Sequence, residues 1–125
     1  MSILLESSGA RDLKVNAWNW GVLHHLVTRA GLFPEEDWEP KRSNGGGELE
    51  QSQVIALANF LEAKVLPQLH EGERMFFDGT VTDVPDGGTF YRAEAELWRN
   101  YSLHHHVLVS IIAFLRSTNG QVTFL

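Results

Sequence analysis

The chain contains no cysteine and few basic residues, and these two shortages exclude several classes of protein. Without cysteine it has neither a disulfide framework nor a thiolate metal site, which fits a reducing compartment, and we expect the cytoplasm. Lysine and arginine total 10 against 16 aspartate and glutamate residues, so the formal net charge is −6. A surface of this sign does not attract nucleic acid or an anionic membrane, and we expect neither as a partner.

Long apolar runs are also missing. The longest, Val107 to Leu115, is interrupted by Ser110 and is too short to cross a bilayer. The apolar run Ile3 to Leu5 has no basic residue ahead of it, so it does not read as a signal peptide. Hydrophobic residues make up 43% of the 125 positions, and the sequence therefore predicts a single soluble domain spanning residues 1–125.

Periodicity and capping residues predict an α+β fold, with three main helices packed with a small, mostly antiparallel sheet. The first helix follows the N-cap Asn16 and closes at Gly31, and the second runs from about Gln51 to Leu66. The third and longest is expected over roughly Phe90 to Arg116, with Thr89 as its cap. The expected sheet combines the N-terminal strand at Ile3–Leu5, a central hairpin turning at Asp78-Gly79, and a C-terminal strand at Val122–Leu125.

The pattern W-x4-L-H-H occurs at Trp18 to His25 and again at Trp98 to His105. The match stops outside this window, so we interpret it as coincidence rather than as a duplicated domain. Helical phase places His24 in solvent and His25 on the flank of the first helix. In the third helix the same reasoning places His104 in the apolar stripe and His106 outside it.

The histidines are the candidates for chemistry. Either His104 or His25 is suitable as a general base, in a cleft between the first and third helices, with an Asp or Glu side chain orienting it. No two histidines have the i,i+4 spacing that lets one helix chelate a metal, so we expect neither a metal nor another cofactor.

Aromatic residues give a second kind of candidate site. Trp20 lies off the apolar stripe of the first helix, Trp98 flanks that of the third, and Trp38 falls in the long connection at 32–50. With Lys41 and Arg42 they suit a surface that binds a partner or a ligand. Three consecutive glycines predict that segment 38–47 is mobile and belongs to this surface. The alternative is that Trp38 fills the core.

Two functions from different classes remain open. The first is a small acidic binding module for a protein or a small ligand, and a homodimer is compatible with it. The second is a histidine-dependent hydrolase that uses a general base. We favour binding, because no complete set of nucleophile, base and orienting residue is visible in the sequence. A cavity lined by His104, His25 and a carboxylate would favour the enzyme, whereas a convex aromatic patch would favour binding.

Overall fold

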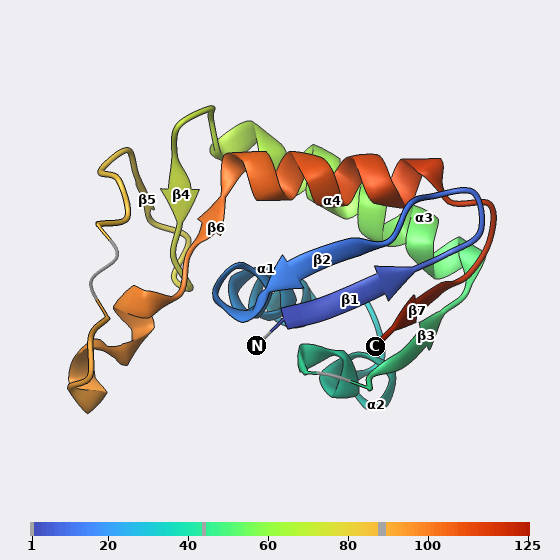
Figure 1. Cartoon of the computed structure of the whole chain (residues 1–125), viewed down its shortest axis with the longest axis horizontal. Coiled ribbons are helices and arrows are strands. Elements are labelled where there is room, and N and C mark those ends of the chain that lie inside the picture. The colour runs from blue at the N-terminus through green and yellow to red at the C-terminus, as the bar shows by residue number, and fades with distance from the viewer. Residues whose placement is uncertain (1, 44, 88–89) are drawn as a thin grey trace.

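The computed structural model describes residues 2–43, 45–87 and 90–125, and these form the predicted α+β fold (Figure 1). None of the helices in these ranges has the length and apolar character needed to cross a membrane. The helices are α1 (Ala17–Ala30), α2 (Glu35–Trp38), α3 (Gln51–Phe60) and α4 (His105–Ser117). The strands are β1 (Ser2–Glu6), β2 (Leu13–Asn16), β3 (Gly47–Leu49), β4 (Arg74–Met75), β5 (Val81–Thr82), β6 (Leu103–His104) and β7 (Val122–Phe124).

The strands form two antiparallel sheets rather than the single sheet expected. The larger has the order β2-β1-β7-β3, and the smaller has the order β5-β4-β6. The predicted N- and C-terminal strands do pair, through β1 and β7. The central hairpin turns at Asp78-Gly79 as predicted, but it pairs with β6 and stays separate from the terminal strands. The four-stranded sheet buries Ile3, Leu5, Val15, Val122 and Phe124 in the core that it shares with α1 and α4.

The first helix has the boundaries that its capping residues predict. The Asn16 side chain accepts a hydrogen bond of 2.9 Å from the backbone N–H of Asn19. At the other end Gly31 adopts a φ of 64°, a left-handed conformation that favours glycine. Between them α1 buries Val22, Leu23 and Val27 completely. The helix is therefore held by its own ends and by a continuous apolar face.

The second helix begins at Gln51 as predicted and loses its regular geometry near its end. A π-helical turn at Leu61–Val65 follows α3, and a 3-10 helix at Leu66–Gln68 follows that turn. In the π-helical turn the Leu66 N–H donates to the Leu61 carbonyl, five residues back. Pro67 lies in the first turn of the 3-10 helix, where its missing N–H costs nothing. Leu69 then adopts an extended backbone, so the helical segment ends close to the predicted Leu66.

The prediction of a third helix from Phe90 is wrong, because α4 begins only at His105. The backbone N–H of His104 donates to the Asn19 side chain at 2.8 Å, and that of His105 donates to the Glu73 carbonyl at 3.1 Å. These tertiary bonds replace the helical ones, so Leu103 and His104 become strand β6. A 3-10 helix at Glu94–Asn100 precedes it. Thr89, the expected cap, lies outside the described residues.

Candidate functional site

A cavity of about 380 Å³ opens beside α1, where the hairpin and the connection after α2 approach the helix. At this cavity the Tyr101 ring packs closely against Gly21 of α1. A Cβ atom added at Gly21 would lie only 3.0 Å from that ring. A larger residue would push Tyr101 away from the helix. The residues that line the cavity are Ala17, Gly21, His24, His25, Thr28, Glu39, Arg42, Phe77 and Tyr101.

His24 is buried against Trp38, so the expectation that it faces solvent is wrong. The two rings are stacked, with centroids 4.8 Å apart and planes 6° from parallel. Nε2 of His24 lies 2.8 Å from the Trp38 carbonyl oxygen, which can only accept, so Nε2 carries the proton. In return, Trp38 Nε1 donates to the His24 carbonyl at 3.1 Å. Burial lowers the pKa of His24 and favours the neutral ring.

Trp20, Trp38 and Lys41, expected at a binding surface, are all buried. Trp20 Nε1 donates to the Lys41 carbonyl at 2.7 Å, and Lys41 Nζ donates to the Asp37 carbonyl. Burial also lowers the pKa of Lys41. The Trp38 ring borders a further cavity, of about 330 Å³, together with Phe33. These side chains attach the connection after α1 to the core. Segment 38–47, which we expect to be mobile, includes Asn44, and this residue lies outside the described ones.

Of the remaining candidates, His25 and Arg42 line the cavity of about 380 Å³ beside α1. His25 is exposed and meets the Phe77 ring edge-on at 5.4 Å. Arg42 is exposed and its Nε lies 3.6 Å from the Glu39 carboxylate. Sequence reasoning missed Glu39 and His24 here. Only the fold reveals them, because the connection returns to cover α1.

His104 lies elsewhere, so the two proposed catalytic histidines do not line one cavity. It is half-buried in β6, and its Nδ1 lies 3.2 Å from the Asn19 side-chain oxygen. Burial, followed by the nearby charges of His106 and Arg74, lowers the pKa of His104. Across the described ranges, no three His, Asp or Glu side chains are close enough together to hold a metal ion.

A row of four aromatic rings, which we call the aromatic row, extends from the cavity along the surface. Phe77 and Tyr101 form a wall of the cavity, with ring centroids 5.1 Å apart. Tyr101 meets Trp18 edge-on at 4.9 Å, and Trp18 lies 5.8 Å from Phe90. The four residues come from separate segments of the chain, so no local sequence pattern could indicate that they lie together.

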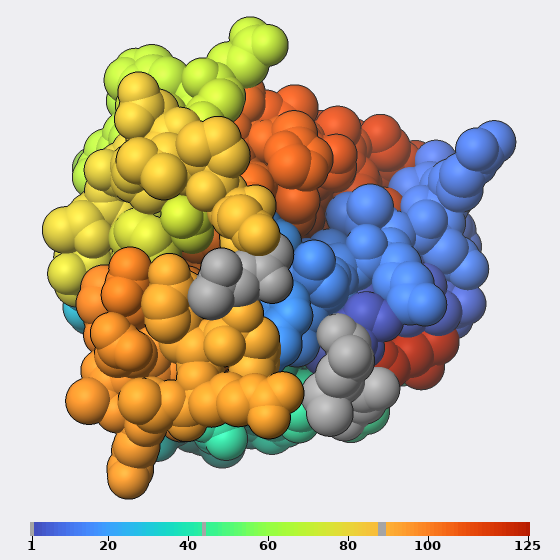
Figure 2. Space-filling view, turned by 60° about the vertical axis from the view of Figure 1, so that its left-hand side comes forward, coloured from blue at the N-terminus to red at the C-terminus, as the bar shows by residue number. Residues whose placement is uncertain are grey.

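Phe90 belongs to a projecting segment between β5 and β6, which we call the arm, comprising residues 83–87 and 90–100. Figure 1 shows residues 90–100 of the arm extending away from the helices and the larger sheet, and Figure 2 shows them on the face turned forward. Large apolar side chains are exposed along the arm, with Val84 61%, Phe90 52% and Trp98 47% accessible. Trp98, predicted as a site residue, is thus the one tryptophan of that predicted set that lies on the surface.

Specific bonds hold the arm in shape. Asn100 pairs with the Tyr91 backbone twice, accepting from its N–H at 2.7 Å and donating to its carbonyl at 2.8 Å. The Arg99 guanidinium lies over the Tyr91 ring, 4.2 Å from its centroid. Arg74 Nε donates to the Val84 carbonyl at 3.0 Å and anchors the start of the arm to β4. The arm therefore presents its apolar side chains in a defined arrangement.

The chain matches no protein-family model, and no curated protein or solved structure is significantly similar to it.

Proposed function

We propose that the chain is a protein-binding module that recognises its partner through the arm and the aromatic row. The observation that carries this proposal is the distribution of exposed apolar side chains. Among the described residues eight large hydrophobic side chains are exposed, and five of them lie on the arm or the aromatic row. These five are Trp18, Val84, Phe90, Leu97 and Trp98.

The energetics favour covering this surface. Each Å² of apolar surface removed from water stabilises a complex by about 25 cal/mol before association costs are subtracted. Tryptophan is among the residues whose truncation costs an interface most, commonly more than about 2 kcal/mol. Trp18 and Trp98 are both exposed here. Their exposure in the isolated chain is consistent with an interface that a partner completes.

Arginine side chains support the same proposal. Arg92 lies over the Phe90 ring at 6.0 Å, and Arg74 lies over Phe76 at 5.0 Å. Phe76 also meets Trp98 edge-on at 5.4 Å. Stacking holds these long side chains partly in place, so less side-chain entropy is lost when a partner binds. Aromatic residues and arginine are enriched at protein interfaces and among the residues that contribute most to binding.

The geometry gives less support to the histidine-dependent enzyme. That function needs His104 or His25 beside an orienting carboxylate. His104 does not line the cavity, and Glu39, the carboxylate that lines it with His25, pairs with Arg42 at 3.6 Å. The Thr28 hydroxyl, which does line it, donates to the His24 carbonyl at 2.9 Å. His24 Nε2 is likewise engaged by the Trp38 carbonyl. The cavity borders the aromatic row, and we assign it to the same binding surface, where it can accept a projecting side chain of the partner.

Affinity capture with matched variants tests the proposal. The purified chain is immobilised and exposed to an extract of its source cell, and retained proteins are compared between variants. The double variant Phe90→Ala/Trp98→Ala removes two exposed arm side chains. The control Ile55→Ala/Val109→Ala removes two exposed apolar side chains of α3 and α4. We expect one saturable partner that the arm variant loses and the control keeps. Equal retention by both variants, or no saturable partner, would contradict the proposal.

A further inference from the structure

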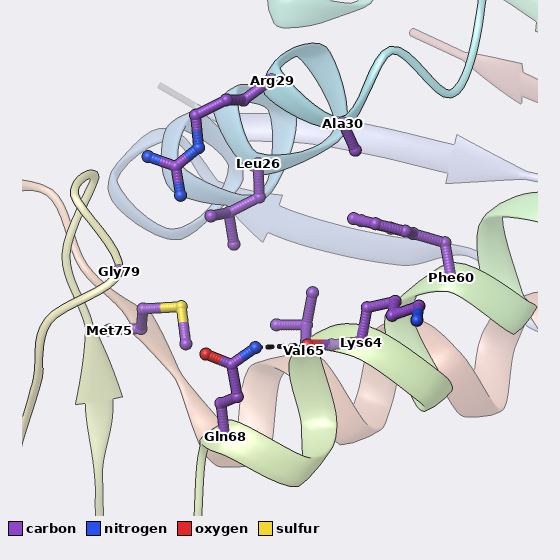
Figure 3. A pocket seen from close by; sticks show the side chains of 9 residues that line it. All are labelled: Leu26, Arg29, Ala30, Phe60, Lys64, Val65, Gln68, Met75 and Gly79. Atoms are coloured by element: carbon purple, nitrogen blue, oxygen red, sulfur yellow. Dashed lines mark hydrogen bonds between the residues drawn. The ribbon is translucent and has the colours of Figure 1, made fainter.

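A third cavity, of about 210 Å³, lies between α1 and the distorted end of the second helix (Figure 3). None of its lining residues also lines the cavity beside the aromatic row. It is therefore a separate site, independent of the proposed protein interface. Its lining comprises Leu26, Arg29, Ala30, Phe60, Lys64, Val65, Gln68, Met75 and Gly79.

The floor of this cavity is apolar. Leu26, Val65 and Met75 are all buried, and Phe60 is half-buried beside them. Figure 3 shows Leu26 pointing from α1 toward Val65, which points back from the π-helical turn, with Met75 at one end. Contact between such a floor and a hydrocarbon group is therefore favoured over contact with water.

The two charged residues that line the cavity are both cations. Arg29 and Lys64 both line it, and its lining contains no acidic residue although the chain carries a net charge of −6. Figure 3 places Arg29 at the end nearest Gly79 and Lys64 at the end nearest Phe60. The acidic neighbour Asp78 accepts hydrogen bonds from the Thr80 hydroxyl at 2.6 Å and the Thr80 N–H at 3.0 Å. These bonds, and then the nearby Arg29, lower the pKa of Asp78, so this carboxylate is ionised and partly balances the charge of Arg29. The two lining cations, Arg29 and Lys64, still outnumber it.

The backbone is irregular where it forms this cavity. Lys64 and Val65 belong to the π-helical turn, a geometry that is rare and that occurs frequently at functional sites. Gln68 stabilises the turn by donating to the Lys64 carbonyl at 2.7 Å (Figure 3). The turn brings a cation and a buried apolar side chain to the same opening.

We propose that this cavity binds a small organic carboxylate with a short hydrocarbon tail. The tail would contact Leu26, Val65 and Met75, and the carboxylate would pair with Arg29 or Lys64 at the rim. The cavity is smaller than the roughly 300–1,000 Å³ that is usual for drug-sized ligands, which limits the tail to a few carbons. An apolar floor alone would accept a neutral hydrocarbon, and the two cations alone would accept inorganic anions. Their combination selects a molecule with both features.

NMR titration of the full chain with hexanoate tests the proposal. Acetate provides the charge without the tail, and hexanol provides the tail without the charge. The double variant Arg29→Met/Lys64→Met removes both cations while keeping long side chains. Its matched control, Arg11→Met/Lys14→Met, removes an exposed arginine and an exposed lysine near β2. The variant Ala30→Phe fills the opening without changing charge, and it keeps the proposal testable should the double variant fail to fold.

We expect hexanoate to bind saturably, with shifts centred on Leu26, Val65 and Met75, and more tightly than acetate or hexanol. A charged hydrogen bond contributes about 1.5–3 kcal/mol, so loss of both cations should weaken hexanoate binding at least about tenfold. Ala30→Phe should weaken it similarly, and the control should leave it unchanged. Failure of hexanoate to saturate, shifts centred elsewhere, or equal affinity in the double variant and its control would overturn the proposal.

Discussion

At the scale of single residues, His24 shows how one buried imidazole connects two parts of the chain. Its Nε2–H donates to the Trp38 carbonyl, and its own carbonyl accepts from Trp38 Nε1. The bond to the Trp38 carbonyl is open to the protonated ring as well, but burial disfavours the charge and lowers the pKa of His24. The covering connection therefore depends on the protonation state of His24.

This dependence predicts that the protein is less stable in mild acid. Above the ordinary histidine pKa of 6.5, His24 is neutral in both the folded and unfolded states. As the pH falls below 6.5, the unfolded state takes up the proton first, so the free energy of unfolding decreases. His104, whose pKa is also lowered, acts in the same direction. The slope per group is at most about 1.4 kcal/mol per pH unit.

Urea unfolding at pH 7.5 and pH 5.5 measures the effect. We expect His24→Gln to be less stable than the parent at pH 7.5 and to lose less stability on acidification. The control His70→Gln changes an exposed imidazole that lies outside both α1 and β6. An unchanged pH slope in His24→Gln would show that His24 is not the group responsible.

At the scale of elements, the connection between α1 and α3 is held by Trp38 more than by its short helices. Trp38 contacts the rings of Trp20, Phe33 and Phe124 at centroid distances of 6.1, 5.4 and 6.4 Å. Replacing a buried aromatic residue with alanine generally costs about 3–5 kcal/mol. We therefore expect Trp38→Ala to lower the free energy of unfolding by this amount, measured by urea denaturation.

The same variant separates the two interpretations of Trp38. If partner capture survives in Trp38→Ala under conditions where it is folded, the side chain fills the core and takes no part in recognition. The exposed Trp98→Ala should show the converse, with little loss of stability and loss of the partner. A stable Trp38→Ala protein that no longer captures the partner would contradict this assignment.

Sequence reasoning predicted the elements that local chemistry determines. Asn16 and Gly31 delimit α1 through their own backbone and side-chain bonds, and Asp78-Gly79 turns the hairpin through local geometry. It could not predict where α4 begins, because His104 and His105 find backbone partners on distant segments. It also missed β3, where Gly47 pairs with Phe124 despite the glycine-rich sequence before it. Long-range pairing outweighed local preference at both places.

The candidate site was predictable to a similar degree. Aromatic and basic residues were expected at a binding surface, but their exposure depends on which segment covers which helix face. Trp20 and Trp38 became buried because the 35–42 connection returns across α1. Trp98 remained exposed because the arm leaves the core before β6. The aromatic row required four segments to meet and had no sequence signature.

At the scale of the whole molecule, the structure is asymmetric. The helices and the larger sheet share one apolar core, while the arm projects from one end and carries exposed Val84, Phe90, Leu97 and Trp98 (Figure 1). In the isolated chain these apolar side chains stay in contact with water. A partner that covers the arm removes their surface from water, which stabilises the complex. A second copy of the chain would present the same apolar surface and is one candidate for this partner.

Site-specific photocrosslinking in the source cell tests the central claim most directly. A benzophenone amino acid replaces Trp98 in one variant and Ile55, an exposed residue of α3, in the control. We expect an adduct of defined mass from position 98, lost when Phe90→Ala is added, and none from position 55. An adduct of twice the chain mass would identify the partner as a second copy. Equal crosslinking from both positions, or no adduct from position 98, would contradict the assignment of the arm as the recognition surface.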